Sequence, residues 1–290
     1  MTSFYLGRLA DARRAYEELA ALGDGEEARP ESLVYGQDLS VGPLGYLGWT
    51  QTLMGECERG AATVERALAR AREGGHPFTI AHALNVAGLV RCDRREPALV
   101  AAHGEEMLAL AREHHFPFLV ALALMLVGWA RFALGAATEG LALMSEGEAR
   151  YRAAHQKVGV RARAQLAEAL AAAGELDRAL AVADGALEHA RATRDDVYRS
   201  EVLRVKGETL ARRGADGDGA LACLREAVDV ARAQGAALLA LRAATSLVRL
   251  QRARGTAAAT ATLEAIHRGF TEALDLPDLR AARELLAARA

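Results

Sequence analysis

The chain has 290 residues, a formal net charge of −2 and a sequence pI near 6.5. Its basic residues are almost all arginines, with Lys157 and Lys206 as the only lysines, so nothing in the overall charge indicates a nucleic-acid partner. The three cysteines (Cys57, Cys92 and Cys223) are far apart and form no C-x-x-C pair. They predict neither a disulfide framework nor a zinc site, and they fit a reducing cytoplasm.

Neither a leader sequence nor a membrane span is predicted. Residues 1–16 contain no basic region followed by an apolar stretch, so we expect no signal peptide. The longest uncharged run, Phe116 to Ala130, is shorter than the ~20 residues that a spanning helix needs. We expect this run to be a helix buried between two neighbours, in a cytoplasmic protein.

Seven turn positions recur along the chain at a nearly constant spacing, and only the first interval is clearly longer than the rest. Glycine occupies every one of them except the third, which is an arginine. Self-similarity at a fixed period of this kind is typical of solenoids, in which each repeat buries its apolar face by stacking on its neighbours. The turn positions are Gly7, Gly55, Arg95, Gly135, Gly174, Gly214 and Gly255.

Each repeat reads as an apolar helix, a turn and an amphipathic helix that ends in charged residues. This order predicts a helical hairpin, and proline at the start of several helices agrees with it because the first turn needs no proline N–H. We therefore predict an all-α fold, a right-handed α-solenoid superhelix of about seven hairpins with a period of ~40 residues. The predicted helices cover residues 9–22, 43–54, 58–73, 77–93, 97–113, 117–134, 138–154, 158–173, 177–193, 196–213, 219–234, 236–254, 257–274 and 278–289.

We predict a single solenoid domain over residues 1–290. Its parts are an incomplete first repeat (1–22), a connection rich in Gly and Pro (23–42), six full repeats (43–274) and a capping helix (275–290). The first repeat lacks most of its first helix, because Gly7 lies so close to the start of the sequence. A truncated repeat exposes apolar surface unless something covers it, so the chain is expected to be a segment or a relic of a longer protein.

Small residues mark where the two helices of a hairpin should meet. One lies two helical turns before five of the turn positions, at Gly48, Gly88, Gly128, Ala167 and Gly207. Another follows most turn positions at a fixed distance, as at Gly60 and Gly140. Glycine inside a helix costs ~1 kcal/mol relative to alanine, so its recurrence needs a reason. We expect close approach of the two helix backbones at these positions.

These residues resemble the tetratricopeptide repeat, with a period longer than that of the standard repeat. The pattern of a large residue, Leu-Gly, a large residue, a small residue and another large one is carried twice, by Leu44, Leu47-Gly48, Gln51, Gly60 and Val64, and by Leu124, Val127-Gly128, Arg131, Gly140 and Met144. The usual Trp and Tyr of that pattern are replaced by aliphatic or polar residues. The resemblance implies stacked helical hairpins.

Further segments resemble the C-terminal helical-repeat region of large bacterial signalling proteins. In that family a class III nucleotidyl cyclase domain and an AAA/STAND-type ATPase precede repeats similar to those of MalT-like activators. The resemblance implies a sensor or scaffold arm linked to an NTPase. It rests on Tyr35-Gly36-Gln37-Asp38, Gly48-Trp49, His76-Pro77-Phe78, Arg94-Arg95-Glu96-Pro97, the segment from Leu241 to Leu247, and Gly269-Phe270-Thr271-Glu272 near Asp278-Leu279.

The sequence contains no catalytic motif that we can place. Residues 135–140 have the spacing of a phosphate-binding loop, but Leu141 stands where the lysine is required. The histidines form no His-Glu-x-x-His motif, and no Ser or Cys stands in a nucleophile elbow. We expect a chain that is not an enzyme and binds no cofactor or metal. A further hypothesis is an enzyme that contains this region only as an accessory.

In stacked hairpins of this kind the first helices line the concave surface. Counting from the first small residue of each repeat predicts a groove with an apolar, aromatic N-terminal half and a C-terminal half rich in Arg and Glu. The candidate binding residues on this face are Trp49, Asn85, Met125, Trp129, Phe132, Arg204, Glu208, Arg249 and Arg252.

Two interpretations stay open for the most conspicuous of these residues. Trp49 and Trp129, the only tryptophans, occupy equivalent positions two repeats apart. They are either core residues or a pair of binding anchors, since Trp is both well buried on average and common in binding hot spots. Arg242, Arg249 and Arg252, with Arg254 nearby, are either a solvated helix face or a site for an acidic peptide or phosphate-bearing partner.

The sequence thus predicts a non-catalytic protein-interaction and regulatory module, linked to a bacterial cyclase or NTPase signalling system. Its expected partner is a protein or peptide, including a cognate cyclase or NTPase domain, bound on the concave face. Direct binding of nucleic acid or membrane is not expected. The alternative is a small-molecule inducer-sensing domain of a MalT-like regulator, with the ligand in the apolar half of the groove.

Overall fold

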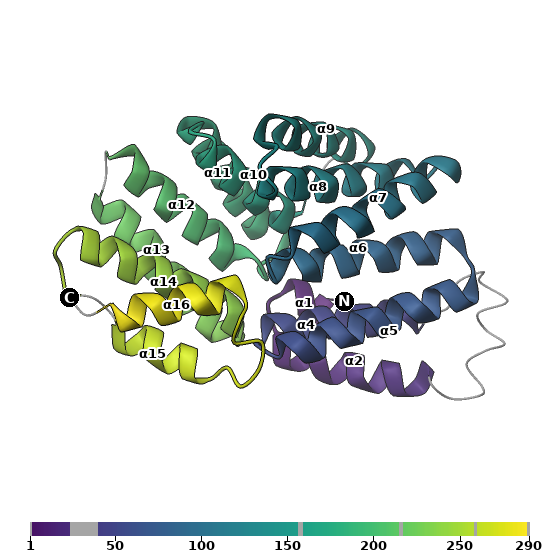
Figure 1. Cartoon of the computed structure of the whole chain (residues 1–290), viewed down its shortest axis with the longest axis horizontal. Coiled ribbons are helices and arrows are strands. Elements are labelled where there is room, and N and C mark those ends of the chain that lie inside the picture. Colours follow the sequence, from purple (N-terminus) through teal and green to yellow (C-terminus); the bar gives the residue numbers. More distant parts are fainter. Residues whose placement is uncertain (1, 24–39, 156–158, 215–216, 258–259, 289–290) are drawn as a thin grey trace. The chain divides into compact units, whose positions relative to one another are not determined.

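The computed structural model describes residues 2–23, 40–155, 159–214, 217–257 and 260–288. Within these ranges it contains 15 helices and no β-strand, which confirms the predicted all-α class (Figure 1). The helices are α1 (Thr2–Tyr5), α2 (Leu9–Gly23), α4 (Val41–Leu53), α5 (Cys57–Gly74), α6 (Pro77–Asp93), α7 (Pro97–Glu113), α8 (Pro117–Ala133), α9 (Ala137–His155), α10 (Val160–Ala172), α11 (Leu176–Thr193), α12 (Arg199–Arg213), α13 (Gly217–Gln234), α14 (Ala237–Ala253), α15 (Thr260–Arg268) and α16 (Pro277–Ala287).

Successive helices pack as hairpins, as the repeat predicts. The pairs α6–α7, α8–α9, α10–α11 and α12–α13 each contact along their length. The first helices of neighbouring hairpins also contact one another, in the pairs α6–α8, α10–α12, α12–α14 and α14–α16. We call such a row of first helices a first-helix layer and describe it separately for each part of the chain: one row consists of α4, α6 and α8, and the other of α10, α12, α14 and α16.

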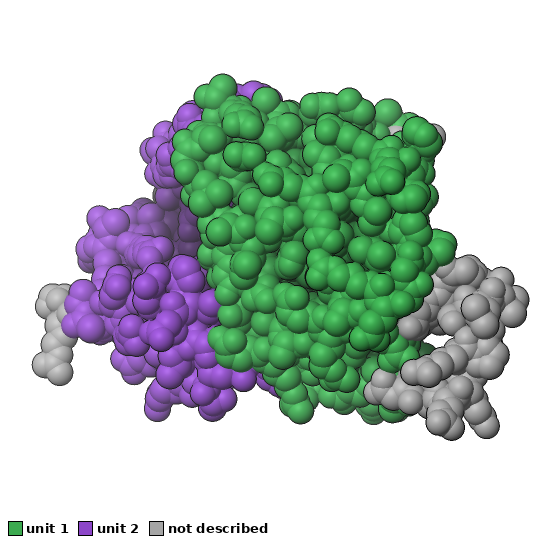
Figure 2. Space-filling view, turned by 45° about the vertical axis from the view of Figure 1, so that its right-hand side comes forward, with its two compact units in different colours: residues 1, 10–52, 57–158 green, residues 2–9, 53–56, 159–290 purple. Residues whose placement is uncertain are grey.

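The described residues form two compact units (Figure 2). Unit 1 contains residues 10–52 and 57–158, and unit 2 contains residues 2–9, 53–56 and 159–290. The segment 53–56 joins unit 2 through Gly55, where an added Cβ would lie 3.2 Å from Cε1 of Phe270. That residues 1–290 act as one domain stays a prediction. Most of the predicted connection over residues 23–42 lies outside the described residues.

All seven predicted turn positions adopt a left-handed backbone conformation. Their φ angles run from 58° at Arg95 to 99° at Gly55, a region that glycine enters without steric cost. At Gly135 the amide donates to the Phe132 carbonyl at 3.1 Å, and the next amide donates to the Arg131 carbonyl at 2.9 Å. This hydrogen-bond pattern closes the C-terminal end of α8 and turns the chain into α9.

Sequence reasoning missed a second series of left-handed residues, which lies between the hairpins. It comprises Gly75, His115, Arg194 and Gly235, with φ angles of 69°, 54°, 58° and 70°. The signal was present in the spacing, because Gly75 and Gly235 are separated by four whole repeat periods. The series was not recognised because two of its four positions, His115 and Arg194, are not glycine.

The predicted close approach of helix backbones is confirmed at two hairpins. A Cβ added to Gly140 would lie 2.6 Å from the Gly128 carbonyl oxygen, and one added to Gly128 would lie 2.7 Å from the Gly140 oxygen. The same reciprocal contact joins Gly48 and Gly60, at 2.7 and 2.5 Å. Gly88 differs, because its nearest neighbour is the Leu126 side chain of the next first helix, at 2.9 Å. That glycine therefore admits a side chain of the neighbouring hairpin.

The structure differs from the predicted helices at the two ends of the chain. The predicted helix over 257–274 ends at Arg268, because Gly269 follows and the chain turns so that Phe270 is only 6% exposed. At the N-terminus, Phe4 and Leu9 are fully buried, and residues 2–5 form the short helix α1. These two apolar residues of the incomplete first repeat are therefore covered, whereas Leu19 and Leu22 near the end of α2 are exposed.

Candidate functional site

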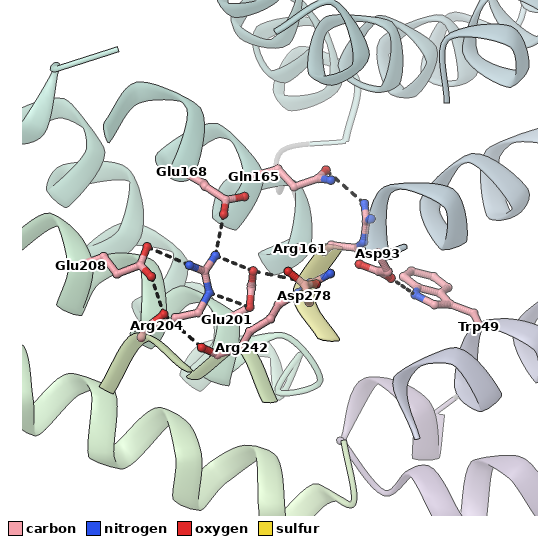
Figure 3. A network of polar contacts seen from close by, with 11 residues as sticks. Trp49, Asp93, Arg161, Gln165, Glu168, Glu201, Arg204, Glu208, Arg242 and Asp278 are labelled. Atoms are coloured by element: carbon pink, nitrogen blue, oxygen red, sulfur yellow. Dashed lines mark hydrogen bonds and ion pairs between the residues drawn. The ribbon is translucent and has the colours of Figure 1, made fainter. Parts of the chain in front are cut away.

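The first-helix layer of unit 2 carries a network of ion pairs centred on Arg204 of α12 (Figure 3). Its guanidinium group donates to Glu168 of α10 at 2.7 Å, to Glu201 at 2.7 and 3.1 Å and to Glu208 at 2.8 Å. A second arginine, Arg242 of α14, lies 3.7 Å from Glu201. The network thus joins three consecutive first helices, α10 and α12 by charge-assisted hydrogen bonds and α12 and α14 by an ion pair.

Arg242 extends the same network to α16 and closes it on α12. Its Nε donates to Oδ2 of Asp278 at 2.6 Å. The hydroxyl of Ser246, one turn further along α14, donates to the Arg242 carbonyl at 3.0 Å and to the Glu208 carboxylate. Four successive first helices of unit 2, α10, α12, α14 and α16, are therefore held together by side chains (Figure 3).

The centre of this network is buried, whereas its edges reach solvent. The side chains of Arg204, Arg242 and Glu201 are 6%, 6% and 8% exposed, but those of Glu168 and Glu208 are 27% and 38% exposed. Burial alone would raise the pKa of Glu201, but Arg204 and Arg242 hold it below its ordinary value. Glu201 is therefore an anion at neutral pH, and the outer carboxylates are what a ligand would meet.

Unit 1 carries an aromatic cluster on its first helices. The Tyr46 ring of α4 lies 5.7 Å from the Tyr16 ring, 5.8 Å from Trp49 and 6.4 Å from His82, measured between centroids. The Trp49 indole N–H donates to Oδ2 of Asp93 at 3.0 Å in a buried hydrogen bond. Such a bond fixes the ring in one orientation, since a buried indole N–H needs an acceptor.

Asn85 of α6, like Arg91 and His103, carries a buried polar atom in unit 1 that has no hydrogen-bond partner among the described residues. The residue is 8% exposed, and its carboxamide oxygen is buried without a hydrogen-bond partner among the described residues. It lies three residues after His82, on the same side of the helix. An unpaired buried acceptor of this kind costs about 1–3 kcal/mol, so its presence calls for an explanation.

The structure places the nine predicted site residues in different environments. In unit 1, Trp49, Asn85, Met125 and Trp129 are 5%, 8%, 5% and 6% exposed, and Phe132 is half-buried. In unit 2, Arg204 and Glu208 are in direct contact, Arg249 is exposed, and Arg252 donates to the Leu285 carbonyl at 2.7 Å. Both tryptophans have the burial that the core interpretation requires, and the role of all nine in binding stays a prediction.

Sequence reasoning missed Glu201 and Asp278, and it did not connect Glu168 or Arg242 with Arg204. A regular spacing nevertheless links these residues. Glu168 and Arg204 are 36 residues apart, and so are Arg242 and Asp278. A separation of 36 residues equals one repeat period minus about one helical turn. Two residues at this separation lie on adjacent first helices, where opposite charges can pair. A search for acid–Arg pairs at this spacing would have found the network.

His82 makes the stability of unit 1 depend on pH. Burial lowers the pKa of its imidazole below the ordinary 6.5, so the folded chain favours the neutral ring. Below pH 6.5 the unfolded chain gains a proton that the folded chain resists, and stability falls as the pH falls. We expect His82→Gln to flatten this dependence by at most ~1.4 kcal/mol per pH unit, the limit for one proton.

Urea unfolding of the wild type and His82→Gln between about pH 7.5 and 5.5 checks this expectation. His103 leaves a residual slope in both proteins, because burial lowers its pKa as well. Identical slopes for the two proteins would contradict the assignment to His82.

Metal clusters and membrane spans were also sought among the described residues. Among them, no three His, Cys, Asp or Glu side chains come together in a way that would hold a metal ion. None of the described helices combines the length and apolar character needed to cross a bilayer.

Helical hairpins that follow one another along the chain, with neighbouring first helices in contact within each unit, define the fold as a tetratricopeptide-like solenoid. No protein-family model matches the sequence, and no curated protein matches it. Among solved structures, 71 chains match.

Three of the matching structures are complexes of PlcR and Rap proteins. PlcR of Bacillus thuringiensis, in complex with the peptide PapR7 and DNA, matches with a TM-score of 0.58 and 12% identity over 72% of this chain and 74% of that chain. The Rap conjugation gene regulator of plasmid pLS20, in complex with the Phr* peptide, matches with a TM-score of 0.64 and 13% identity. The match covers 97% of this chain and 68% of that chain. A Rap protein complexed with Competence and Sporulation Factor matches with a TM-score of 0.61 and 16% identity. The match covers 94% of this chain and 72% of that chain. At these identities the likeness shows the fold.

Proposed function

We propose that this chain is a non-catalytic regulatory module that binds a short peptide on its first-helix layer. The matching PlcR structure and that of the Rap conjugation gene regulator contain peptides, which supports a peptide as the ligand class. The similarity of the fold does not carry the proposal by itself, because one fold can host unrelated functions. Support from this chain comes from Asn85.

Asn85 has the chemistry that an extended peptide needs. A carboxamide offers one acceptor and two donors, which match the N–H and C=O groups of a peptide main chain. Its oxygen has no partner within the described residues, so a ligand N–H would supply the missing hydrogen bond. His82, about one helical turn before Asn85, belongs to the same aromatic cluster as Tyr46 and Trp49.

Unit 2 supports the proposal with charge. Glu168, Glu208 and Asp278 are the parts of the ionic network that reach solvent, while the two arginines that hold them are buried. Carboxylates fixed in this way accept hydrogen bonds without losing side-chain entropy on binding. A peptide with basic side chains fits this face better than an acidic one.

The cyclase or NTPase partner expected from the sequence resemblance remains a finer proposal. Neither domain is named in the matching structures described above, which are Rap and PlcR regulators. A peptide-binding module and a cyclase-linked arm are compatible, because the peptide would act as the signal and the linked domain as its target.

The proposal is tested by selecting random short peptides on the immobilised full chain and measuring their affinities by fluorescence anisotropy. In Asn85→Leu, an apolar side chain of similar size removes the unpaired oxygen. We expect peptide affinity to fall about tenfold or more, while the free energy of unfolding stays equal or rises. A binding loss with undiminished stability cannot come from unfolding.

Two outcomes would count against the proposal. One is a selection that enriches no peptide over a blank support. The other is equal affinity of the wild type and Asn85→Leu for every selected peptide. If small metabolites, and not peptides, raise the melting temperature, the inducer-sensing alternative replaces it.

A further inference from the structure

Residues 2–9 contact the rest of unit 2 through main-chain hydrogen bonds. The Tyr5 carbonyl oxygen accepts the amide of Asp196 at 2.7 Å and the amide of Val197 at 3.2 Å. Both amides belong to the link between α11 and α12, just before the N-terminus of α12. These amides have no helical acceptor of their own, so the segment satisfies donors that the link would otherwise leave open.

Two side-chain positions add sequence specificity to this contact. Phe4 is fully buried and packs edge-on against the Tyr5 ring, with centroids 5.5 Å apart. Gly7 has a φ of 70°, and a Cβ there would lie 2.4 Å from Nε2 of Gln234. Gln234 cannot simply move aside, because the same nitrogen donates to the Asp196 carbonyl at 2.7 Å.

The α11–α12 link is also tied to the rest of unit 2. Asp195 accepts the amide of Val160, at the N-terminus of α10, at 3.2 Å. Arg161 lies over the Tyr198 ring, 5.4 Å from its centroid. The surface that receives the segment is therefore held in place by residues 159–290 themselves.

We propose that the α11–α12 link together with Gln234 is a segment-binding surface, and that its ligand is the chain's own residues 2–9 bound in cis. The surface recognises a segment by an open carbonyl, a Phe and a Gly that follows it one helical turn later. This site is separate from the first-helix layer and does not depend on the proposed peptide function. Residues 2–9 act as a built-in ligand that completes unit 2.

The test weakens the segment in the full chain and supplies it again as a separate peptide. Phe4→Ala removes the buried anchor, and we expect it to lower the melting temperature while the chain stays helical. A synthetic peptide of residues 2–10 should then bind this variant and raise its melting temperature again. Peptides carrying Phe4→Ala or Gly7→Val should not, and the wild-type chain, whose site is filled, should not respond to any of them.

Hydrogen exchange gives a second measurement on the same proteins. We expect the amides of Asp196 and Val197 to be protected in the wild type, to exchange faster in Phe4→Ala, and to regain protection with the residue 2–10 peptide. If Phe4→Ala does not fold, the full-length Gly7→Val variant replaces it in both measurements. The exchange rates of the wild type also test the proposal without any variant, because unprotected Asp196 and Val197 amides would overturn it.

Three other results would also overturn it. The first is a helical variant that the peptide neither binds nor stabilises. The second is equal rescue by the unmodified peptide and the one with Gly7→Val. The third is a wild-type dimer in solution that dissociates in Phe4→Ala, because the segment would then bind a second copy in trans.

Discussion

Replacing Arg204 by Met is expected to lower the free energy of unfolding by about 3–5 kcal/mol at neutral pH. The guanidinium group contacts three carboxylates, and Glu201, the most buried of them, would keep only Arg242 at 3.7 Å. Leaving a buried charge without its partner costs far more than losing a solvated ion pair. Urea denaturation followed by circular dichroism measures the change.

Arg14→Met is a matched control, because Arg14 is paired with Asp11 on an exposed surface, at 70% and 54% exposure. We expect a change of about 0–0.5 kcal/mol there. The double variant Glu201→Gln with Arg204→Met should be less destabilised than the sum of the two single variants. A loss at Arg204 no larger than at Arg14 would contradict the view that the network holds the first helices together.

The same network predicts the effect of acid. The pKa of Glu201 is lower in the folded chain than its ordinary 4.5, since the two arginines outweigh the cost of burial. Its contribution to stability is therefore complete above pH 4.5 and is lost as the pH falls through the lower, folded-state pKa. Arg204→Met should remove most of this acid dependence.

Gly140→Ala is expected to destabilise the chain by about 2–3 kcal/mol, although alanine favours a helix by ~1 kcal/mol over glycine. The new Cβ would lie 2.5 Å from the Phe132 amide nitrogen and 2.6 Å from the Gly128 carbonyl oxygen. Backbone atoms cannot rotate away, so α8 and α9 would have to move apart. The measurement is again the free energy of unfolding.

Gly185→Ala is the same chemical change, but we expect it to change the free energy of unfolding in the opposite direction. Gly185 lies within α11, and a Cβ added to it meets nothing within 4 Å. Here only helix propensity acts, and we expect stabilisation by about 0.5–1 kcal/mol. Equal effects at the two glycines would show that backbone contact does not explain the recurrence of Gly140.

The fold was predictable because every repeat has the same physical constraints, and these constraints favour the same residue types at the same positions. A left-handed turn favours glycine, and a close helix crossing excludes a side chain, so Gly135 and Gly140 recur in register with their counterparts. Arg95 was placed by spacing alone and has the predicted conformation. The largest departures from the predicted helices lie where the repeat stops, at Arg268 and in residues 2–5, and α12 begins at Arg199 instead of residue 196.

The candidate site was less predictable, because it depends on contacts between repeats. Position counting selected Arg204 and Glu208, but it could not show that Glu201 and Arg242 share their charges. The orphaned oxygen of Asn85 and the hydrogen bond from Trp49 to Asp93 depend on side-chain orientation, which no periodicity encodes. Arg249 and Arg252 lie on one predicted face, yet one is exposed and the other binds Leu285.

The most direct test of peptide binding on the first-helix layer is hydrogen exchange on the full chain with and without a selected peptide. We predict that added protection falls on first helices, above all on residues 77–93 around Asn85, and that the second helices α5, α7 and α9 exchange at unchanged rates. Protection confined to the second helices, or no change in any helix at saturating peptide, would contradict the proposal.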